Sequence, residues 1–261
     1  MAAARFPLTT AELADFTTAV ETHILPGYTP DRPFLPRTAG VATIGSCFAE
    51  HIGKTLTGLG IPAAWVAVDE NNNTPFVTDL AFSKLRDRAN GPERHKIEQL
   101  LNSSLVIITV GVALQRFVEG HPAAAGKDSY KGGDWRMFTV DELTTYLRSI
   151  VAKARALLPG AHLVLTLSPI PLKGSPAHAS VFGQDCLSKS LMRVAIEQVL
   201  NDRTPDLTYW PSFEIIRWLG GHVGPFFGGE GAEDQRHVKK PILDAIMRLF
   251  ISRYFLDAPS P

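Results

Sequence analysis

Short apolar segments of strand length alternate with helical patterns along this chain, and this alternation restricts the fold more than any other feature. One segment, residues 105–110, is a nearly continuous apolar run, which is typical of a strand in a parallel sheet covered on both faces. Strands are predicted at residues 41–44, 63–68, 105–110, 163–167 and 207–210. Because strands that alternate with helices need right-handed crossovers, the pattern predicts an α/β fold with a parallel sheet.

Helical periodicity and capping residues account for most segments between these strands. Capping boxes formed by Thr9 with Glu12 and by Thr139 with Glu142 predict helices that extend to about Ile24 and Leu158. Further helices are predicted at residues 48–59, 187–200 and 237–255, and as two short pieces within 78–102. Residues 115–136 show little periodicity and are predicted as a long loop, and residues 220–231 as a glycine-dense loop.

The chain is long enough for one large core. It has 261 residues, 45% of them apolar, and no shift in composition divides it. We therefore predict one α/β domain over residues 37–261. Residues 1–36 are predicted as an N-terminal helix followed by an extended arm with prolines at positions 26, 30, 33 and 36.

Charge and composition exclude several classes of partner. The net charge is zero and the pI is about 7.1, so neither a nucleic-acid partner nor an electrostatic membrane partner is expected. The longest apolar runs have strand length, so no membrane-spanning segment is expected. The N-terminus lacks the long apolar stretch of a signal peptide, and two cysteines do not make a disulfide framework. These features predict a cytoplasmic protein.

A serine follows the first predicted strand, where a helix begins. The turn reads Gly45-Ser46-Cys47, and the helix N-terminus offers backbone N–H groups that can hold developing negative charge. The Ser46 hydroxyl could act as a nucleophile or could cap the helix. The Cys47 thiol is a rival nucleophile, because a helix N-terminus lowers the pKa of a thiol. Adjacent residues point in different directions, so we favour Ser46, with Cys47 packed beneath the turn.

A pair of residues near the C-terminus could complete the site. Asp234 and His237 lie three residues apart at the predicted start of the last helix. His237 could act as general base toward Ser46, with Asp234 orienting its ring. In the alternative interpretation, Asp234 is a helix N-cap and His237 an ordinary residue of the first turn. Arg236 is expected to be solvated or structural. Combined with the serine turn, the pair predicts acyl-transfer chemistry.

Other polar or small residues also follow predicted strands. Ligands bind outside the carboxyl ends of parallel strands, so Ser46, Gly111 and Ser168 are expected at one edge of the sheet. An oxyanion needs hydrogen-bond donors. The candidates are the Ser46 amide, the Gly111 amide and a side chain from the asparagine run at 71–73. Within this run we take Asn73 as the candidate donor. The run could equally form a solvent-exposed turn. Ser168 is expected to contact substrate.

Two short patterns resemble a phosphate-binding loop and a metal site, but neither has the required spacing. Gly53-Lys54-Thr55 resembles the end of a phosphate-binding loop, but the required earlier glycine falls at Phe48. The histidines at 121, 222 and 237 lack the spacing of metal ligands. Neither a metal nor another cofactor is therefore expected.

The run Gly45-Ser46-Cys47-Phe48-Ala49 resembles the signature of the GSCFA family, which belongs to the SGNH (GDSL-like) hydrolase superfamily. The resemblance extends over about residues 36–250 and includes Ser188-Lys189-Ser190. It implies a three-layer α/β/α sandwich with a five-stranded, flavodoxin-like parallel sheet. It also implies that Ser46, Asp234 and His237 are catalytic. The superfamily's asparagine block does not carry over, since residues 112–114 after Gly111 contain no Asn.

Residues and resemblance together predict a serine-dependent esterase or O-acyltransferase with an acyl-enzyme on Ser46. The expected substrate is a small-molecule or glycan ester, such as an acetylated carbohydrate. Two alternatives stay open. One is a non-catalytic protein that binds an anion at the helix N-terminus after Gly45. The other is a thiol acyl-transfer enzyme that depends on Cys47.

Overall fold

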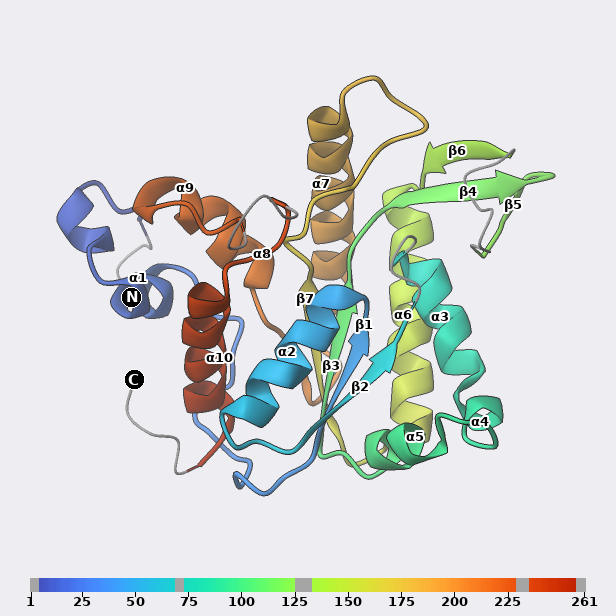
Figure 1. Ribbon diagram of the computed structural model, residues 1–261, viewed down its shortest axis with the longest axis horizontal. Coiled ribbons are helices and arrows are strands. Elements are labelled where there is room, and N and C mark those ends of the chain that lie inside the picture. The colour runs from blue at the N-terminus through green and yellow to red at the C-terminus, as the bar shows by residue number, and fades with distance from the viewer. Residues whose placement is uncertain (1–4, 69–72, 125–132, 229–234, 257–261) are drawn as a thin grey trace.

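A five-stranded parallel sheet forms the centre of the computed structural model, which describes residues 5–68, 73–124, 133–228 and 235–256 (Figure 1). Its strands are β1 (Val41–Gly45), β2 (Ala63–Ala67), β3 (Leu105–Val110), β7 (His162–Leu167) and β8 (Leu207–Tyr209). The order is β2-β1-β3-β7-β8, with every neighbouring pair parallel. Flavodoxin-like sheets have this same order. The predicted α/β fold is therefore confirmed.

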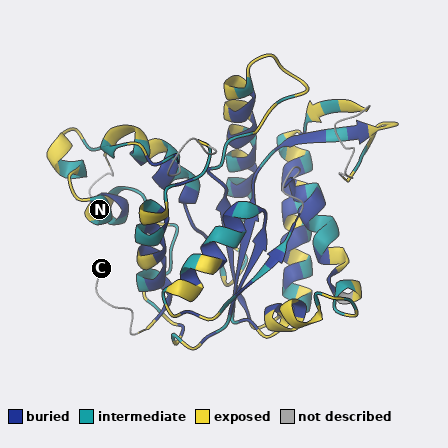
Figure 2. Ribbon diagram, in the orientation of Figure 1, coloured by how far each residue is buried: buried dark blue, intermediate teal, exposed yellow. Residues whose placement is uncertain are grey.

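Helices cover both faces of the sheet and complete the three layers (Figure 1). One face is covered by α3 (Pro75–Ser83), α5 (Arg94–Leu101), α6 (Val140–Leu157) and α7 (Val181–Leu200), and the other by α1 (Phe16–His23), α2 (Cys47–Gly58) and α10 (Lys240–Tyr254). Successive strand side chains point to opposite faces, so Ile108 packs in the first layer and Ile107 in the second. Both faces of β3 and β7 are consequently buried (Figure 2).

The two predicted capping boxes are both present, but only one of them opens the predicted helix. The capping box of Thr139 and Glu142 is present at the start of α6. The box of Thr9 and Glu12 is also present, but it opens only the short 3-10 helix η1 (Thr10–Leu13). The Asp15 side chain then accepts the Thr18 amide at 2.7 Å and starts α1. The prediction of one helix continuing to Ile24 is therefore wrong.

Other boundaries also differ from the prediction. The segment 78–102 forms three helices, because α4 (Leu85–Arg88) separates α3 from α5. Helix α7 begins before residue 187, since the Ser180 hydroxyl accepts the Gly183 amide at 3.1 Å and caps an earlier turn. After β8 come the short elements α8 (Ser212–Glu214), a π-helical segment (Ile215–Leu219) and α9 (Gly220–Val223). Helix α10 begins at Lys240, which leaves His237 in the preceding turn.

A second, antiparallel sheet lies where the sequence predicts a long loop. It consists of β4 (Leu114–Val118), β5 (His121–Pro122) and β6 (Asp134–Met137), in the order β5-β4-β6. The loop prediction is therefore wrong for these described strands. Contacts between these strands that a hydrophobic pattern cannot reveal help to stabilise them. In one of them, the Arg136 guanidinium lies 3.8 Å from the centre of the Phe117 ring.

The N-terminal arm packs against the C-terminal helix. The amides of Phe34 and Leu35 donate to the carbonyl of Tyr254 at 3.2 and 3.0 Å, and Leu35 is buried beside Phe255. The domain division at residue 36 stays a prediction. Among the described residues, none of the helices combines the length and hydropathy that a bilayer crossing needs.

A buried histidine in β7 makes the stability of the fold depend on pH. The Nε2 atom of His162 lies 2.9 Å from the Thr208 hydroxyl, and its ring packs 5.0 Å from that of Phe34. Burial lowers the pKa of His162 to about 4. In the unfolded chain the imidazole binds a proton near its ordinary pKa, so the unfolded state gains protons first as the pH falls.

We therefore predict that the free energy of unfolding decreases by roughly 3 kcal/mol as the pH falls from about 6.5 to about 4, at ~1.4 kcal/mol per pKa unit. The His162→Gln variant keeps a polar group near Thr208 and should lose this dependence. Urea unfolding at several pH values measures it. His178→Gln, at an exposed position, is the matched control, and an equal change in both variants would contradict the prediction.

Candidate active site

Gly45 brings the serine turn close to the neighbouring strand. Its φ is +151°, and a Cβ atom at this position would lie 2.9 Å from the Thr109 backbone oxygen and 3.0 Å from the Ala49 Cβ. Only glycine fits there without displacing backbone. The turn between β1 and α2 therefore places Ser46 between the carboxyl ends of β2 and β3, the position where sheets of this order bind ligands.

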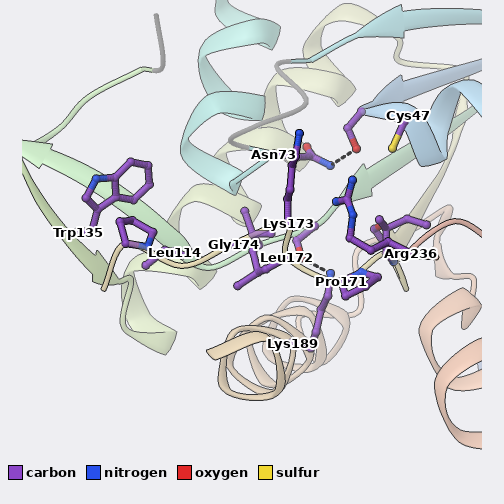
Figure 3. Close-up of a pocket in the computed structure, with 16 residues that line it drawn as sticks. Cys47, Asn73, Leu114, Trp135, Pro171, Leu172, Lys173, Gly174, Lys189 and Arg236 are labelled. Atoms are coloured by element: carbon purple, nitrogen blue, oxygen red, sulfur yellow. Dashed lines mark hydrogen bonds between the residues drawn. The ribbon is translucent and has the colours of Figure 1, made fainter. Parts of the chain in front are cut away.

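The Ser46 hydroxyl does not serve as a helix cap. Ser46 occupies the N-cap position of α2, and all residues of this helix belong to the described part of the chain. The Ser46 side chain makes no capping hydrogen bond. The hydroxyl oxygen instead accepts a hydrogen bond from the Asn73 side-chain amide, with Nδ2 3.3 Å from Oγ (Figure 3). The N-cap interpretation is thus contradicted for this side chain.

Asn73 is buried and held on several sides. Its Nδ2 also donates to the Thr109 carbonyl at 3.2 Å, and its Oδ1 accepts from the Thr78 hydroxyl at 3.5 Å. These contacts fix the amide with its donor group toward Ser46. The interpretation as a solvent-exposed turn is wrong for Asn73, which is 3% exposed. Asn71 and Asn72 lie outside the described residues.

Gly111 supports the site differently from the prediction. Its amide donates to the Asn73 carbonyl at 3.0 Å, and the Val112 amide donates to the same oxygen at 3.1 Å. This geometry contradicts the oxyanion-donor role predicted for the Gly111 amide, because that N–H is directed at Asn73. A Cβ at Gly111 would lie 3.2 Å from Asn73 Nδ2. The Gly111 amide therefore holds the backbone of Asn73, and the absence of a Cβ at position 111 leaves room for the Asn73 side chain.

A pocket of ≈ 170 Å³ opens beside Ser46 (Figure 3). Its wall includes Ser46, Cys47, Asn73, Gly111, Ser168, Trp135, Leu172, Lys173, Lys189 and Arg236. Ser168 is buried, and its hydroxyl accepts the Ile170 amide at 3.3 Å. An apolar cavity of ~150 Å³ holds a benzene molecule, so this pocket has the size of a small ester.

Cys47 lines the same pocket as Ser46. Its side chain is half-buried, which contradicts the expectation that it packs beneath the turn. The cause is the geometry of the first helical turn, which leaves both the N-cap residue and the residue after it on the pocket wall. Neither Cys47 nor Cys186 forms a disulfide.

His237 lies next to the helix that Ser46 precedes. The centre of its ring is 5.7 Å from that of His51 in α2, and its carbonyl accepts the Gly228 amide at 3.0 Å. Within the described part of the chain, no hydrogen bond joins His237 to the Ser46 hydroxyl. Asp234 lies outside the described residues. Arg236 lines the pocket and is half-buried, and its expected solvated or structural role stays a prediction.

Lys189 is the main pocket residue that the sequence analysis did not assign to the site. It is 1% exposed, and its Nζ donates to the Gly111 carbonyl at 2.6 Å. The adjacent Ser188 hydroxyl accepts the Ala113 amide at 2.8 Å. Helix α7 thus holds the segment that in turn holds Asn73. Burial lowers the pKa of Lys189 to about 8, an effect that the nearby Asp185 charge opposes.

A signal for Lys189 is present in the sequence. Residues three and seven positions later, Met192 and Ile196, form the buried face of the same helix, so the lysine interrupts an apolar stripe. Trp135 offered no comparable signal, because it comes from β6, within the segment predicted as a loop.

The five-stranded parallel sheet with helices on both faces defines a three-layer α/β fold. The chain belongs to the GSCFA family, whose profile matches residues 81–250, about two thirds of the sequence. This match begins after the serine turn, so it supports the family independently of residues 45–49.

Solved structures with similar folds include several esterases and a transferase. One is a carbohydrate esterase family 2 enzyme of Corynascus thermopiles (TM-score 0.45, 14% identity, 88% of this chain and 68% of that one). Another is phospholipase A1 of Streptomyces albidoflavus (0.45, 13%, 83% and 99%). A third is the catalytic domain of peptidoglycan O-acetyltransferase A of Streptococcus pneumoniae (0.41, 14%, 83% and 92%). These are likenesses of fold alone. No curated protein sequence matches the chain.

Proposed function

We propose that this protein is a serine-dependent esterase or O-acyltransferase that forms an acyl-enzyme on Ser46. The observation that carries the proposal is the Ser46 hydroxyl itself. It lines a pocket at the N-terminus of α2, is not used as a cap, and lies 3.3 Å from a buried amide donor. A hydroxyl that only stabilised the helix would accept a bond from the helix's own N–H groups.

In the proposed reaction, the Ser46 oxygen attacks the carbonyl carbon of an ester while His237 takes its proton. The Ser46 amide and the Asn73 Nδ2 donate hydrogen bonds to the oxyanion that develops. His237 then protonates the leaving alcohol, and water or a second alcohol releases the acyl group. Asp234 would orient the imidazole. The His237 ring packs beside that of His51 in the structure without substrate, and catalytic hydrogen bonds often tighten only once substrate is bound.

The pocket suggests a short acyl group. Its volume of ≈ 170 Å³ accommodates an acetyl ester with a small part of the alcohol, and the remainder of the alcohol would extend past the rim. Trp135 lies in the wall on the side of β6, where its ring offers a flat apolar surface. An acetylated carbohydrate or a similarly small ester is therefore the substrate class that we propose.

A neutral alkyl fluorophosphonate tests the proposal. We expect it to modify Ser46, as mapped by mass spectrometry of the digested protein, with 4-nitrophenyl acetate turnover lost in proportion. The Cys47→Ala variant is the control and should be labelled at Ser46 at an unchanged rate. Absence of labelling at Ser46, together with no turnover across a panel of short-chain esters, would overturn the assignment as a serine enzyme.

The thiol alternative rests on a specific observation, because Cys47 lines the same pocket. In that case alkylation of Cys47 would remove activity while Ser46→Ala would keep it.

A further inference from the structure

Lys189 supplies a charge at the pocket that the proposed reaction does not use. Its ammonium group is buried and points from α7 into the pocket wall (Figure 3). Its hydrogen-bond partner is the Gly111 carbonyl, a neutral group. An ammonium group has three donors, so this bond leaves two available for a ligand.

The Asp185 carboxylate, whose charge acts on Lys189, is already engaged elsewhere. The Oδ1 atom of Asp185 accepts the Leu172 amide at 2.9 Å, and its Oδ2 forms an ion pair with Arg217. In the part of the chain that the structure describes, no carboxylate lies within ion-pair distance of Lys189 Nζ. Asp185 and Arg217 neutralise each other, which leaves the Lys189 charge without a counter-charge of its own among the described residues.

A half-buried cation on the same helix is paired with carboxylates. Arg193, also on α7, is paired with Glu197 at 2.7 Å and Glu214 at 2.6 Å. A buried charge without such a partner is costly. A neutral donor would be enough to hold the Gly111 carbonyl, so the structural contact alone does not account for an ammonium group at position 189.

The rest of the pocket wall favours the same kind of ligand. Lys173 at the exposed rim and Arg236 add further positive charge to the wall, and none of the described residues in the wall is Asp or Glu. Lys189 and Ser46 line the same pocket of ≈ 170 Å³, so one small ligand can contact both. The buried Lys189 ammonium matches an anionic group of small size, and carboxylate oxygens form strong charge-assisted hydrogen bonds with an ammonium group.

We propose that the ester that enters this pocket carries a carboxylate, which the Lys189 ammonium binds while Ser46 meets the ester carbonyl. This inference rests on the proposed function and adds the substrate class. The carboxylate belongs either to the acyl part or to the alcohol part, and two pairs of substrates distinguish these sources. Ionic recognition of this kind acts mainly through KM, because the charge is bound equally in the ground state and the transition state.

The substrates are two anionic esters, each compared with its neutral methyl ester. For the acyl side we choose 4-nitrophenyl hydrogen succinate against 4-nitrophenyl methyl succinate, and for the alcohol side 4-acetoxybenzoate against methyl 4-acetoxybenzoate. We expect kcat/KM for the anionic member of one pair to exceed that of its neutral partner by about tenfold or more. The preference should decrease above about pH 8, as the ammonium loses its proton.

The Lys189→Met variant keeps most of the side-chain volume and should abolish the preference, because the anionic ester loses about tenfold more kcat/KM than its neutral partner. Lys189→Gln is the second variant, since it keeps a donor for the Gly111 carbonyl without the charge. Lys84→Met, at an exposed position outside the pocket, is the matched control and should keep the preference. An equal loss for anionic and neutral esters in both Lys189 variants would assign Lys189 to positioning the 111–113 segment and overturn the inference.

A binding measurement separates the two proposals. In Ser46→Ala, monomethyl succinate should raise the melting temperature more than dimethyl succinate does, and the added Lys189→Gln change should remove the difference. If this shift is present while wild-type Ser46 is neither labelled nor acylated, the carboxylate site stands and the proposed chemistry fails. If Ser46 is labelled but the shift and the kinetic preference are both absent, the carboxylate site fails.

Discussion

Replacing Ser46 by alanine is expected to reduce ester turnover by about four orders of magnitude or more. The reason is that the variant loses the only atom that the proposed mechanism places in covalent contact with the acyl group. The fold should survive, because the hydroxyl accepts one hydrogen bond, at 3.3 Å from Asn73, and a single neutral bond contributes roughly 1 kcal/mol. Kinetics with 4-nitrophenyl acetate and a melting temperature for each variant measure the two effects.

Cys47→Ala provides the matched comparison, since the two residues are adjacent and line the same pocket. It should keep kcat/KM within about threefold of the unmodified protein. A reversed result, with activity lost in Cys47→Ala and retained in Ser46→Ala, would make the thiol the nucleophile. If neither change reduces turnover, the pocket does not carry covalent chemistry, and anion binding at the N-terminus of α2 becomes the better account.

The parallel sheet could be predicted from sequence because its signal is local. Each residue of β3 is buried against helices on both faces, so the strand needs an apolar run that is visible without any knowledge of its neighbours. The strands β4 and β6 have no such run. They pair mainly with each other, and the Arg136 side chain that covers Phe117 reads as an ordinary polar residue when the chain is scanned for periodicity.

The same distinction applies to the site. Placing Ser46, Asn73 and Ser168 at the carboxyl edge of the sheet required only the ends of the strands, and the structure brings all three to one pocket. The direction of a hydrogen bond cannot be inferred in that way. The Gly111 amide points at the Asn73 carbonyl because residue 73, on another loop, reaches it. Lys189 enters the pocket from the middle of α7, so its position could not be inferred from where the strands end.

The second large effect is expected at Asn73. We predict that Asn73→Ala lowers kcat by about 10²- to 10³-fold, the usual cost of removing one oxyanion donor. Asn73→Asp should be at least as severe, since a carboxylate of the same shape presents negative charge where the oxyanion forms. The KM should change much less than kcat, because the donor acts in the transition state.

The control for Asn73 is Thr78→Val, which removes the hydroxyl that donates to Asn73 Oδ1 at 3.5 Å and leaves the Nδ2 donor in place. Its kcat should stay within about tenfold of the unmodified protein, because a long hydrogen bond contributes little to the orientation of an amide that Thr109 also holds. Asn73 is buried, so melting temperatures must accompany the kinetics. A fall in kcat of the same size in Thr78→Val, or an Asn73→Ala effect confined to KM, would show that the asparagine shapes the pocket and does not stabilise the oxyanion.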